Sequence, residues 1–263
     1  MTIKQALIWA IKQLKTSNSP ALDAEALLSF VLKKDKTFLF AHSEKKLTSN
    51  QLEKFKKLIV RRAKHEPVAY ITNNKEFYGL NFYVDENVLI PRPATESMVE
   101  KALKIISNSK RPITLIDVGT GSGCIMISIL KWIPASAGMT RGGAGMTVVA
   151  IDSSKEALKI AQKNAKKHDV ANRVKFVYSN LLEKIKTNDN ILITANLPYL
   201  TTEQYKNLPP EIKKYEPKSA LVAGKDGMRY YKKLFKQIKT LNLKSQLLYE
   251  CQSGRLQSKS FLN

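Results

Sequence analysis

The 263-residue chain contains little that would support a disulfide framework, a metal centre or a membrane segment. Its two cysteines, Cys124 and Cys251, lie far apart, and neither has another metal-ligating side chain at the short spacing of zinc motifs. No run of about 18 apolar residues occurs, and residues 1–9 lack the basic and apolar regions of a signal peptide. We therefore expect a cytoplasmic protein with no metal site and no membrane association.

Acidic residues are also scarce: 22 Asp and Glu stand against 44 Lys and Arg, which gives a net charge of +22. Such an excess can neutralise the phosphates of a nucleic acid. Most of the excess is Lys, however, and it is spread over segments of helical pattern rather than gathered in one stretch. The charge therefore favours a generally solvated surface and selects acidic partners only weakly.

Residues 1–69 carry apolar side chains at helical spacing, as in the series Leu7, Ala10, Ile11 and Leu14. The sequence from Thr48 to Gln51 is typical of a capping box at the start of a helix. Over residues 70–92 the pattern changes to aromatic and β-branched residues around a glycine, which predicts a β-hairpin linker. We expect a small N-terminal helical domain, followed by this linker.

Residues 93–263 alternate between short apolar strands and helices, which predicts an α/β domain with a Rossmann-like, doubly wound parallel sheet. The predicted strands are 113–118, 148–151, 174–178, 191–195 and 246–250, and the predicted helices are 94–106, 125–132, 154–168 and 227–240. The stretch 134–147 contains Ala-Gly-Met-Thr twice and has no amphipathic period. We interpret it as a low-complexity insertion.

The first predicted strand ends in a glycine-rich turn, which reads Asp117-Val118-Gly119-Thr120-Gly121-Ser122-Gly123. Glycines in such a turn let a ligand approach the backbone just before the next helix begins. A dinucleotide site has a longer GxGxxG pattern that cradles a pyrophosphate, but here Cys124 follows without a further glycine. The shorter motif fits S-adenosylmethionine better, because this cofactor has no phosphate.

Asp152 directly follows the second predicted strand, 33 residues after Gly119. Leaving out the 14 residues of the proposed insertion reduces this separation to 19. An acid about twenty residues after the glycine turn is where doubly wound folds hold the ribose hydroxyls. The spacing therefore supports both a ribose-binding role for Asp152 and the insertion. Capping of the next helix is a second role that is compatible with the first.

The sequence Asn196-Leu197-Pro198-Tyr199 follows the strand 191–195, at the strand end where doubly wound folds place their sites. An amide or adenine nitrogen is a poor nucleophile because its lone pair is delocalised. The Asn196 side-chain oxygen and the Leu197 carbonyl can accept its two N–H bonds, while Pro198 fixes the turn and Tyr199 offers a flat wall. We therefore predict methyl transfer from S-adenosylmethionine to a planar nitrogen.

Several stretches together resemble the HemK/PrmC family of peptide chain release factor glutamine N5-methyltransferases, and this resemblance covers nearly the whole chain. They are Glu66 to Ile71, Glu76 to Leu80, Val88 to Glu96, the glycine turn, Asn196 to Tyr199, and Gly224 to Met228. The resemblance implies a class I S-adenosylmethionine-dependent methyltransferase fold. It also implies that the substrate is the GGQ glutamine of class 1 release factors, and that the helical domain binds the release factor.

The resemblance implies roles for individual residues as well. Those implied to contact the cofactor are Asp117, Gly119, Thr120, Gly121, Ser122, Gly123, Asp152, Asn180, Leu181 and Asn196. The implied substrate-binding residues are Arg92, Thr95 and Glu96, which would border the pocket, and Asn196, Leu197, Pro198 and Tyr199, which would hold the glutamine amide and are also the catalytic set.

The chain departs from the family pattern in three places. The family usually has Pro at position 197 and Asp at position 180, where this chain has Leu and Asn. The family also continues through a helix and a strand hairpin beyond the point where this sequence stops, at Asn263. We therefore expect a truncated C-terminus that leaves an edge of the sheet unpaired.

Two alternatives stay open. An adenine-N6 methyltransferase that acts on rRNA or DNA would use a similar motif at 196–199 and would often be basic, although such enzymes have their glycine turn near the N-terminus. The second alternative is a partner-binding remnant with impaired catalysis, or a fragment of a bifunctional methyltransferase. A class 1 release factor, rather than a nucleic acid, is the expected partner.

Overall fold

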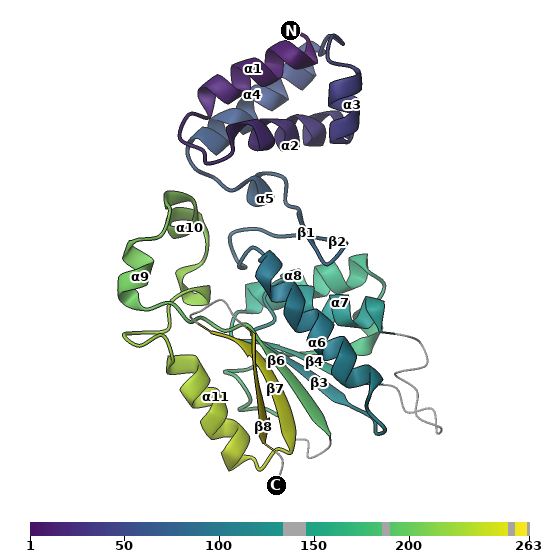
Figure 1. The fold of residues 1–263 in the computed structure, drawn as a ribbon, viewed down its shortest axis with the longest axis vertical. Helices are drawn as coiled ribbons and strands as arrows, with labels where there is room; N and C mark the ends of the chain where they lie inside the picture. Colours follow the sequence, from purple (N-terminus) through teal and green to yellow (C-terminus); the bar gives the residue numbers. More distant parts are fainter. Residues whose placement is uncertain (134–145, 186–189, 252–255, 262–263) are drawn as a thin grey trace. The chain divides into compact units, whose positions relative to one another are not determined.

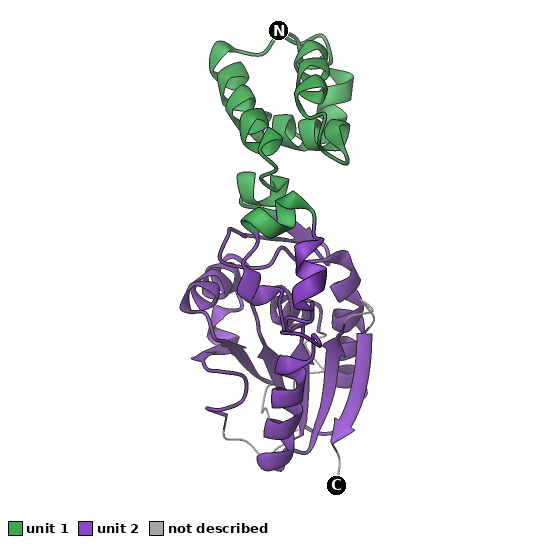
Figure 2. Cartoon of the chain, turned by 90° about the vertical axis from the view of Figure 1, so that its left-hand side faces the viewer, with its two compact units in different colours: residues 1–74, 209–215 green, residues 75–208, 216–263 purple. Residues whose placement is uncertain are grey.

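The computed structural model describes residues 1–133, 146–185, 190–251 and 256–261, and the chain forms two compact units (Figure 2). Unit 1 comprises residues 1–74 and 209–215, and unit 2 comprises residues 75–208 and 216–263. The sequence-based division placed the first boundary at residue 69 and assigned 209–215 to the second domain. Most of the proposed insertion, 134–145, lies outside the described residues, whereas Thr147 is the first residue of a strand.

Unit 1 is helical throughout. Its helices are α1 (Ile3–Gln13), α2 (Pro20–Leu32), α3 (Lys36–Ala41), α4 (Ser49–Ala63), α5 (Val68–Ile71) and α10 (Pro210–Tyr215). The predicted capping box is confirmed: the Thr48 hydroxyl accepts from the Gln51 N–H, and the Gln51 side chain accepts from the Thr48 N–H. The apolar faces of α1, α2 and α4 meet around the fully buried Leu27 and Phe55.

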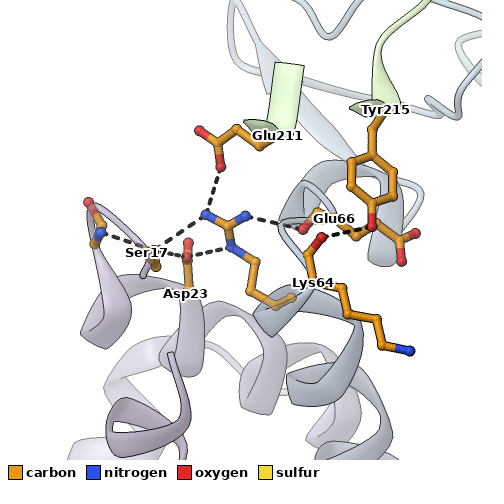
Figure 3. A network of polar contacts seen from close by, with 8 residues as sticks. Ser17, Asp23, Lys64, Glu66, Glu211 and Tyr215 are labelled. Carbon is orange, nitrogen blue, oxygen red and sulfur yellow. Dashed lines mark hydrogen bonds and ion pairs between the residues drawn. The ribbon is translucent and has the colours of Figure 1, made fainter. Parts of the chain in front are cut away.

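Arg62 of α4 is almost fully buried and connects three parts of unit 1. Its Nε donates to Asp23 Oδ2 at 2.7 Å, and its Nη2 pairs with Glu211 Oε2 at 2.8 Å. At the other end of α10, the Tyr215 hydroxyl donates to the Lys64 carbonyl at 2.9 Å (Figure 3). These contacts explain why 209–215 belongs to the helical unit, a grouping that no local pattern in the segment predicts.

Unit 2 begins with a short hairpin of β1 (Lys75–Phe77) and β2 (Leu80–Phe82). The hairpin predicted over 70–92 is limited to these two strands, and Val88 to Ile90, which has strand-like composition, forms no strand. Gly79 takes a positive φ of 71° in the turn between the strands, a conformation that glycine adopts without strain.

The main sheet of unit 2, in which Figure 1 labels β3, β4, β6, β7 and β8, has the strand order β5-β4-β3-β6-β7-β8. Its strands are β3 (Thr114–Val118), β4 (Thr147–Asp152), β5 (Val174–Tyr178), β6 (Ile191–Ala195), β7 (Ser245–Glu250) and β8 (Leu256–Phe261). All neighbouring pairs are parallel except β7 with β8. The doubly wound fold predicted from the sequence is confirmed.

Helices cover both faces of this sheet. They are α6 (Glu96–Ser107), α7 (Cys124–Trp132), α8 (Lys155–Lys167) and α11 (Arg229–Thr240), with α9 (Thr202–Lys206) and the 3-10 helices η1 (Pro93–Thr95), η2 (Ala171–Arg173) and η3 (Lys218–Ala220) in the connections. Leu115 of β3 packs in the core with α6, α7 and α8, whereas its neighbour Ile116 packs in the core with α11. Successive side chains of a buried strand therefore point to opposite faces of the sheet and pack in two separate cores.

The expected truncation does not leave β7 at the edge of the sheet, because a strand pairs with it on each side. β8 pairs antiparallel with β7 along its whole length, from Ser245 opposite Phe261 to Glu250 opposite Leu256.

A separate expectation concerned the membrane. Within the described ranges, no helix is both long enough and apolar enough to cross a bilayer.

We expect Arg62→Leu to lower the free energy of unfolding of unit 1 by about 3 kcal/mol, because it leaves the Asp23 carboxylate, 16% exposed, without its cation. Urea unfolding followed by tryptophan fluorescence in a Trp132→Phe background measures this. Trp9, which packs against Phe55, then reports on unit 1 alone.

The matched control is Lys57→Ala, which breaks an exposed ion pair with Glu53 on the same helix. Because both partners are more than half exposed, the control should leave the free energy of unfolding essentially unchanged. Equal urea midpoints for the two variants would contradict a structural role for the Arg62 contacts.

Candidate active site

The register of the parallel strands brings four distant segments together at one edge of the sheet. Near the carboxyl ends of the four central strands, one row of paired residues consists of Ile151, Val118, Ala195 and Tyr249. The residues that follow them in the chain are Asp152, Gly119, Asn196 and Glu250. Since parallel strands share a direction, these four residues leave the sheet side by side.

A cavity of about 320 Å³ opens at this edge, and its walls belong to unit 2. The predicted site residues on its walls are Arg92, Thr95, Gly119, Thr120, Gly121, Ser122, Asp152, Asn180, Leu181, Asn196, Leu197 and Pro198. The other predicted residues, Asp117, Gly123, Glu96 and Tyr199, lie outside these walls. Within the described residues, no three His, Cys, Asp or Glu side chains gather as a metal site.

The glycine turn requires glycine at Gly119 for two reasons. Its φ is +73°, in the left-handed region, and a Cβ atom built there would lie 2.9 Å from Leu197 Cδ2. The missing side chain thus lets the loop after β3 pack directly on the loop after β6. Gly123 also has a positive φ, of 80°, and its place is the N-cap of α7 rather than the cavity wall.

Asp152 connects the glycine turn to the next helix. Its Oδ2 accepts from the Gly121 N–H at 2.9 Å, and its Oδ1 accepts from the Ser154 N–H at 2.9 Å. The cap of α8 is Ser154 itself, whose hydroxyl accepts from the Ala157 N–H. Burial raises the pKa of Asp152, although the backbone hydrogen bonds oppose the rise. The carboxylate is therefore held in place on the wall by two backbone donors.

Asp117 lies behind the glycine turn and has no exposed surface. Its Oδ2 accepts from the Thr120 hydroxyl at 2.7 Å, and its Oδ1 accepts from the Thr194 hydroxyl at 2.8 Å. These bonds join the loop after β3 to β6. Asp117 therefore shapes the cavity from behind, although the sequence resemblance implied that it contacts the ligand.

The Asn196 amide has a defined orientation. Its Nδ2 donates to Thr95 Oγ1 at 3.0 Å and to Glu250 Oε2 at 3.4 Å, while the Thr95 hydroxyl donates to the same Oε2 at 2.8 Å. A carboxylate can only accept hydrogen bonds, so the nitrogen of Asn196 must face Glu250. Its oxygen, Oδ1, then points away from Glu250, and Asn196 lies on the cavity wall.

Tyrosine hydroxyls form hydrogen bonds that fix the residues after Asn196. The Leu197 N–H donates to the Tyr231 hydroxyl at 3.1 Å, and that hydroxyl donates to the Glu250 carbonyl. The Tyr199 hydroxyl donates to Glu250 Oε1 at 3.0 Å. Burial and the neighbouring Glu250 carboxylate raise the pKa of Tyr199 to about 12, so it is a neutral donor near neutral pH.

Arg92 lies on the cavity wall with a buried partner. Its Nη2 pairs with Glu216 Oε1 at 2.5 Å, and Glu216 Oε2 accepts from the Ile90 N–H at 3.1 Å. Glu96, by contrast, accepts from the Tyr78 N–H at 2.9 Å, at the turn of the β1–β2 hairpin. The predicted role of Glu96 at the cavity therefore has no support in this geometry.

Sequence reasoning missed Glu250, Glu216 and Tyr231. Glu250 ends a predicted strand, as Asp152 nearly does, and the rule that places sites at the carboxyl ends of parallel strands could have found it. Glu216 and Tyr231 carry no such signal, because their partners, Arg92 and Leu197, lie far away in the sequence.

Two family models match the chain: residues 5–72 match the PrmC N-terminal domain, and residues 109–240 match a methyltransferase domain. The chain is 38% identical to the release factor glutamine methyltransferase of Koribacter versatilis, over 90% of this chain and 81% of that protein. It is 37% identical to the protein of the same name from Clostridium acetobutylicum, over 89% and 80%.

Two further matches differ in length or in similarity. The bifunctional methyltransferase of Rickettsia bellii is 35% identical over 82% of this chain, which spans only 41% of that protein. Among solved structures, the hMettl16 catalytic domain in complex with MAT2A 3'UTR hairpin 6 has a TM-score of 0.50 at 15% identity. That match covers 73% of this chain and 68% of the other, and it bears on the fold alone.

The buried Asp117 leads to a prediction about pH. Burial raises the pKa of its carboxyl from 3.8 to about 6, so between about pH 4 and pH 6 the folded chain binds this proton more tightly than the unfolded chain. The contribution of Asp117 to stability therefore falls as the pH rises through this window, by up to about 3 kcal/mol.

We expect Asp117→Asn to remove this pH dependence, because an amide can still bond both Thr120 and Thr194 hydroxyls without a charge. In urea unfolding, the variant should gain stability relative to the natural chain as the pH rises from 4 to 6, with no further gain above pH 7. Parallel stability curves for the two proteins would contradict the raised pKa.

Proposed function

Because the chain belongs to the family of release factor glutamine methyltransferases, we propose that it methylates the side-chain amide nitrogen, N5, of a glutamine in a peptide chain release factor. The methyl donor is S-adenosylmethionine, the release factor is of class 1, and the glutamine lies in its GGQ motif. The protein acts in the cytoplasm. The main support for this proposal is the orientation of the Asn196 amide, because its oxygen can accept a hydrogen bond from the N–H of a planar amide.

The cavity fits a phosphate-free nucleoside cofactor. Its wall combines the close backbone of the glycine turn with Asp152, whose carboxylate retains lone pairs that can accept from ribose hydroxyls. In this proposal Asn180 and Leu181 border the adenine, and Gly119 to Gly121 border the methionine end. Bound there, S-adenosylmethionine would supply a methyl group on its positively charged sulfur.

Asn196 Oδ1 accepts one N–H bond of the substrate amide, and the Leu197 carbonyl accepts the other. These two bonds hold the nitrogen so that its lone pair faces the methyl group, and they strengthen as positive charge develops on the nitrogen. Pro198 restricts the turn, while Thr95 and Glu250 keep the Asn196 amide in place. Arg92, held by Glu216, borders the substrate side of the cavity.

The helical unit binds the release factor in this proposal, since residues 5–72 match a domain model named for PrmC. The net charge of +22 is compatible with this role and with an RNA substrate, so charge does not discriminate between them. Because the chain spans 41% of the Rickettsia bellii relative, the second activity of a bifunctional protein forms no part of the proposal.

We expect Asn196→Ala to reduce methylation of a release factor by at least about 100-fold, because the variant lacks the acceptor that orients the amide. The measurement is transfer of labelled methyl from S-adenosylmethionine to purified release factor. Calorimetry with S-adenosylmethionine should show a much smaller loss, under about tenfold. Asn207→Ala, at an exposed residue after α9, is the control and should leave the rate unchanged.

Deproteinised rRNA is incubated in parallel with the same labelled cofactor. Label on the RNA and none on the release factor would reject the proposal in favour of adenine-N6 methylation. A natural chain that binds no S-adenosylmethionine would instead support the alternative of a partner-binding remnant.

A further inference from the structure

Glu250 is a buried carboxylate, 3% exposed, at the end of β7. None of the ion pairs in the described part of the chain includes it. Its side-chain partners are instead three neutral donors, namely Thr95, Asn196 and Tyr199. Burial of a carboxylate without a cation is unfavourable, so three neutral donors on one carboxylate call for an explanation beyond packing.

The hydrogen bonds around Glu250 allow the Asn196 amide only one orientation. The single hydroxyl proton of Thr95 is donated to Glu250 Oε2, so the Thr95 oxygen can only accept from Asn196. Glu250 Oε2 also can only accept. If the amide turned over, its oxygen would face two acceptors and both bonds would be lost.

Glu250 also restrains the second half of the proposed amide site through its backbone. Its carbonyl accepts from the Tyr231 hydroxyl, and the same hydroxyl accepts from the Leu197 N–H. The side chain of Glu250 therefore orients Asn196, while its main chain restrains Leu197. One residue of β7 thus reaches both residues that would accept the substrate N–H bonds.

We propose that Glu250 is a positioning residue that locks the Asn196 amide with its oxygen toward the substrate nitrogen. This inference rests on the proposed function for its effect on methylation. The carboxylate has a second effect, because accepting from Nδ2 polarises the amide and makes Oδ1 a stronger acceptor. That polarisation matters most as the substrate N–H becomes more acidic during methyl transfer.

Glu250→Gln tests the lock, because a glutamine amide can either donate or accept and so pairs with both orientations of Asn196. We expect kcat/KM for the release factor to fall by about 10- to 100-fold, while the affinity for S-adenosylmethionine changes by less than about threefold. The control is Glu183→Gln, the same chemical change at a half-exposed residue of unit 2, and it should match the natural chain. Equal losses of substrate methylation and cofactor affinity would overturn the proposal.

A spectroscopic measurement tests the lock without any substrate. The side-chain NH₂ resonances of Asn196 are assigned in a ¹⁵N spectrum by their absence from Asn196→Ala. In the natural chain they should show the downfield proton shift of a donor to a carboxylate, and in Glu250→Gln they should move upfield. Resonances that do not move in Glu250→Gln would overturn the proposal even if the activity falls.

Thr95→Val provides a second variant if Glu250→Gln fails to fold, as judged by its thermal unfolding. Valine has the same shape as threonine but lacks the hydroxyl, so it removes one of the two groups that hold Nδ2. We expect a shift of the same Asn196 resonances and a smaller loss of kcat/KM than for Glu250→Gln. No shift in this variant would overturn the lock.

The two proposals fail in different ways. A natural chain that does not methylate the release factor refutes the proposed function, while the Asn196 resonances still decide whether Glu250 orients the amide.

Discussion

The parallel pairing of β3, β4, β6 and β7 in a common register is the constraint on which the rest of the site depends. It places Gly119, Asp152, Asn196 and Glu250 in one row, although more than 130 residues separate the first from the last. The absence of a side chain at Gly119 then lets Leu197 pack against the glycine turn. These two facts shape part of the cavity, because its walls include the loops that leave β3, β4 and β6.

Carboxylates accept hydrogen bonds in two places at this edge of the sheet. Asp117, which is buried, and Asp152, which is half-buried, accept hydrogen bonds from hydroxyl or backbone donors around the glycine turn, on the side of the cavity proposed to hold the cofactor. Glu250 accepts from Thr95, Asn196 and Tyr199, on the side proposed to hold the substrate. In both places a carboxylate that can only accept hydrogen bonds gives its neighbours a single orientation. The positive surface of the protein takes no part in these contacts.

Much of the fold follows from local patterns. The strands 174–178 and 191–195 have their predicted bounds, β3 and β7 differ from theirs by one residue at one end, and β4 differs by one residue at each end. The central strands could be predicted because a buried parallel strand is apolar on both faces. The glycine turn and Asp152 could be found from their spacing once the stretch 134–147 was set aside. The pairing of β8 with β7 could not, because Leu256 to Phe261 is largely polar and has no strand signature of its own.

The sequence by itself determined the doubly wound fold and the family, and it predicted the role of Asn196 to Tyr199, since each depends on short motifs whose residues are close together in the chain. Only the tertiary structure decided that Asp117 lies behind the cavity, that Glu96 accepts from the backbone of the hairpin turn, and that Glu250 accepts from Asn196. It also decided that 209–215 joins the helical unit through Arg62. These are contacts between side chains brought together by strand register and helix packing, and a local pattern carries no information about such distant partners.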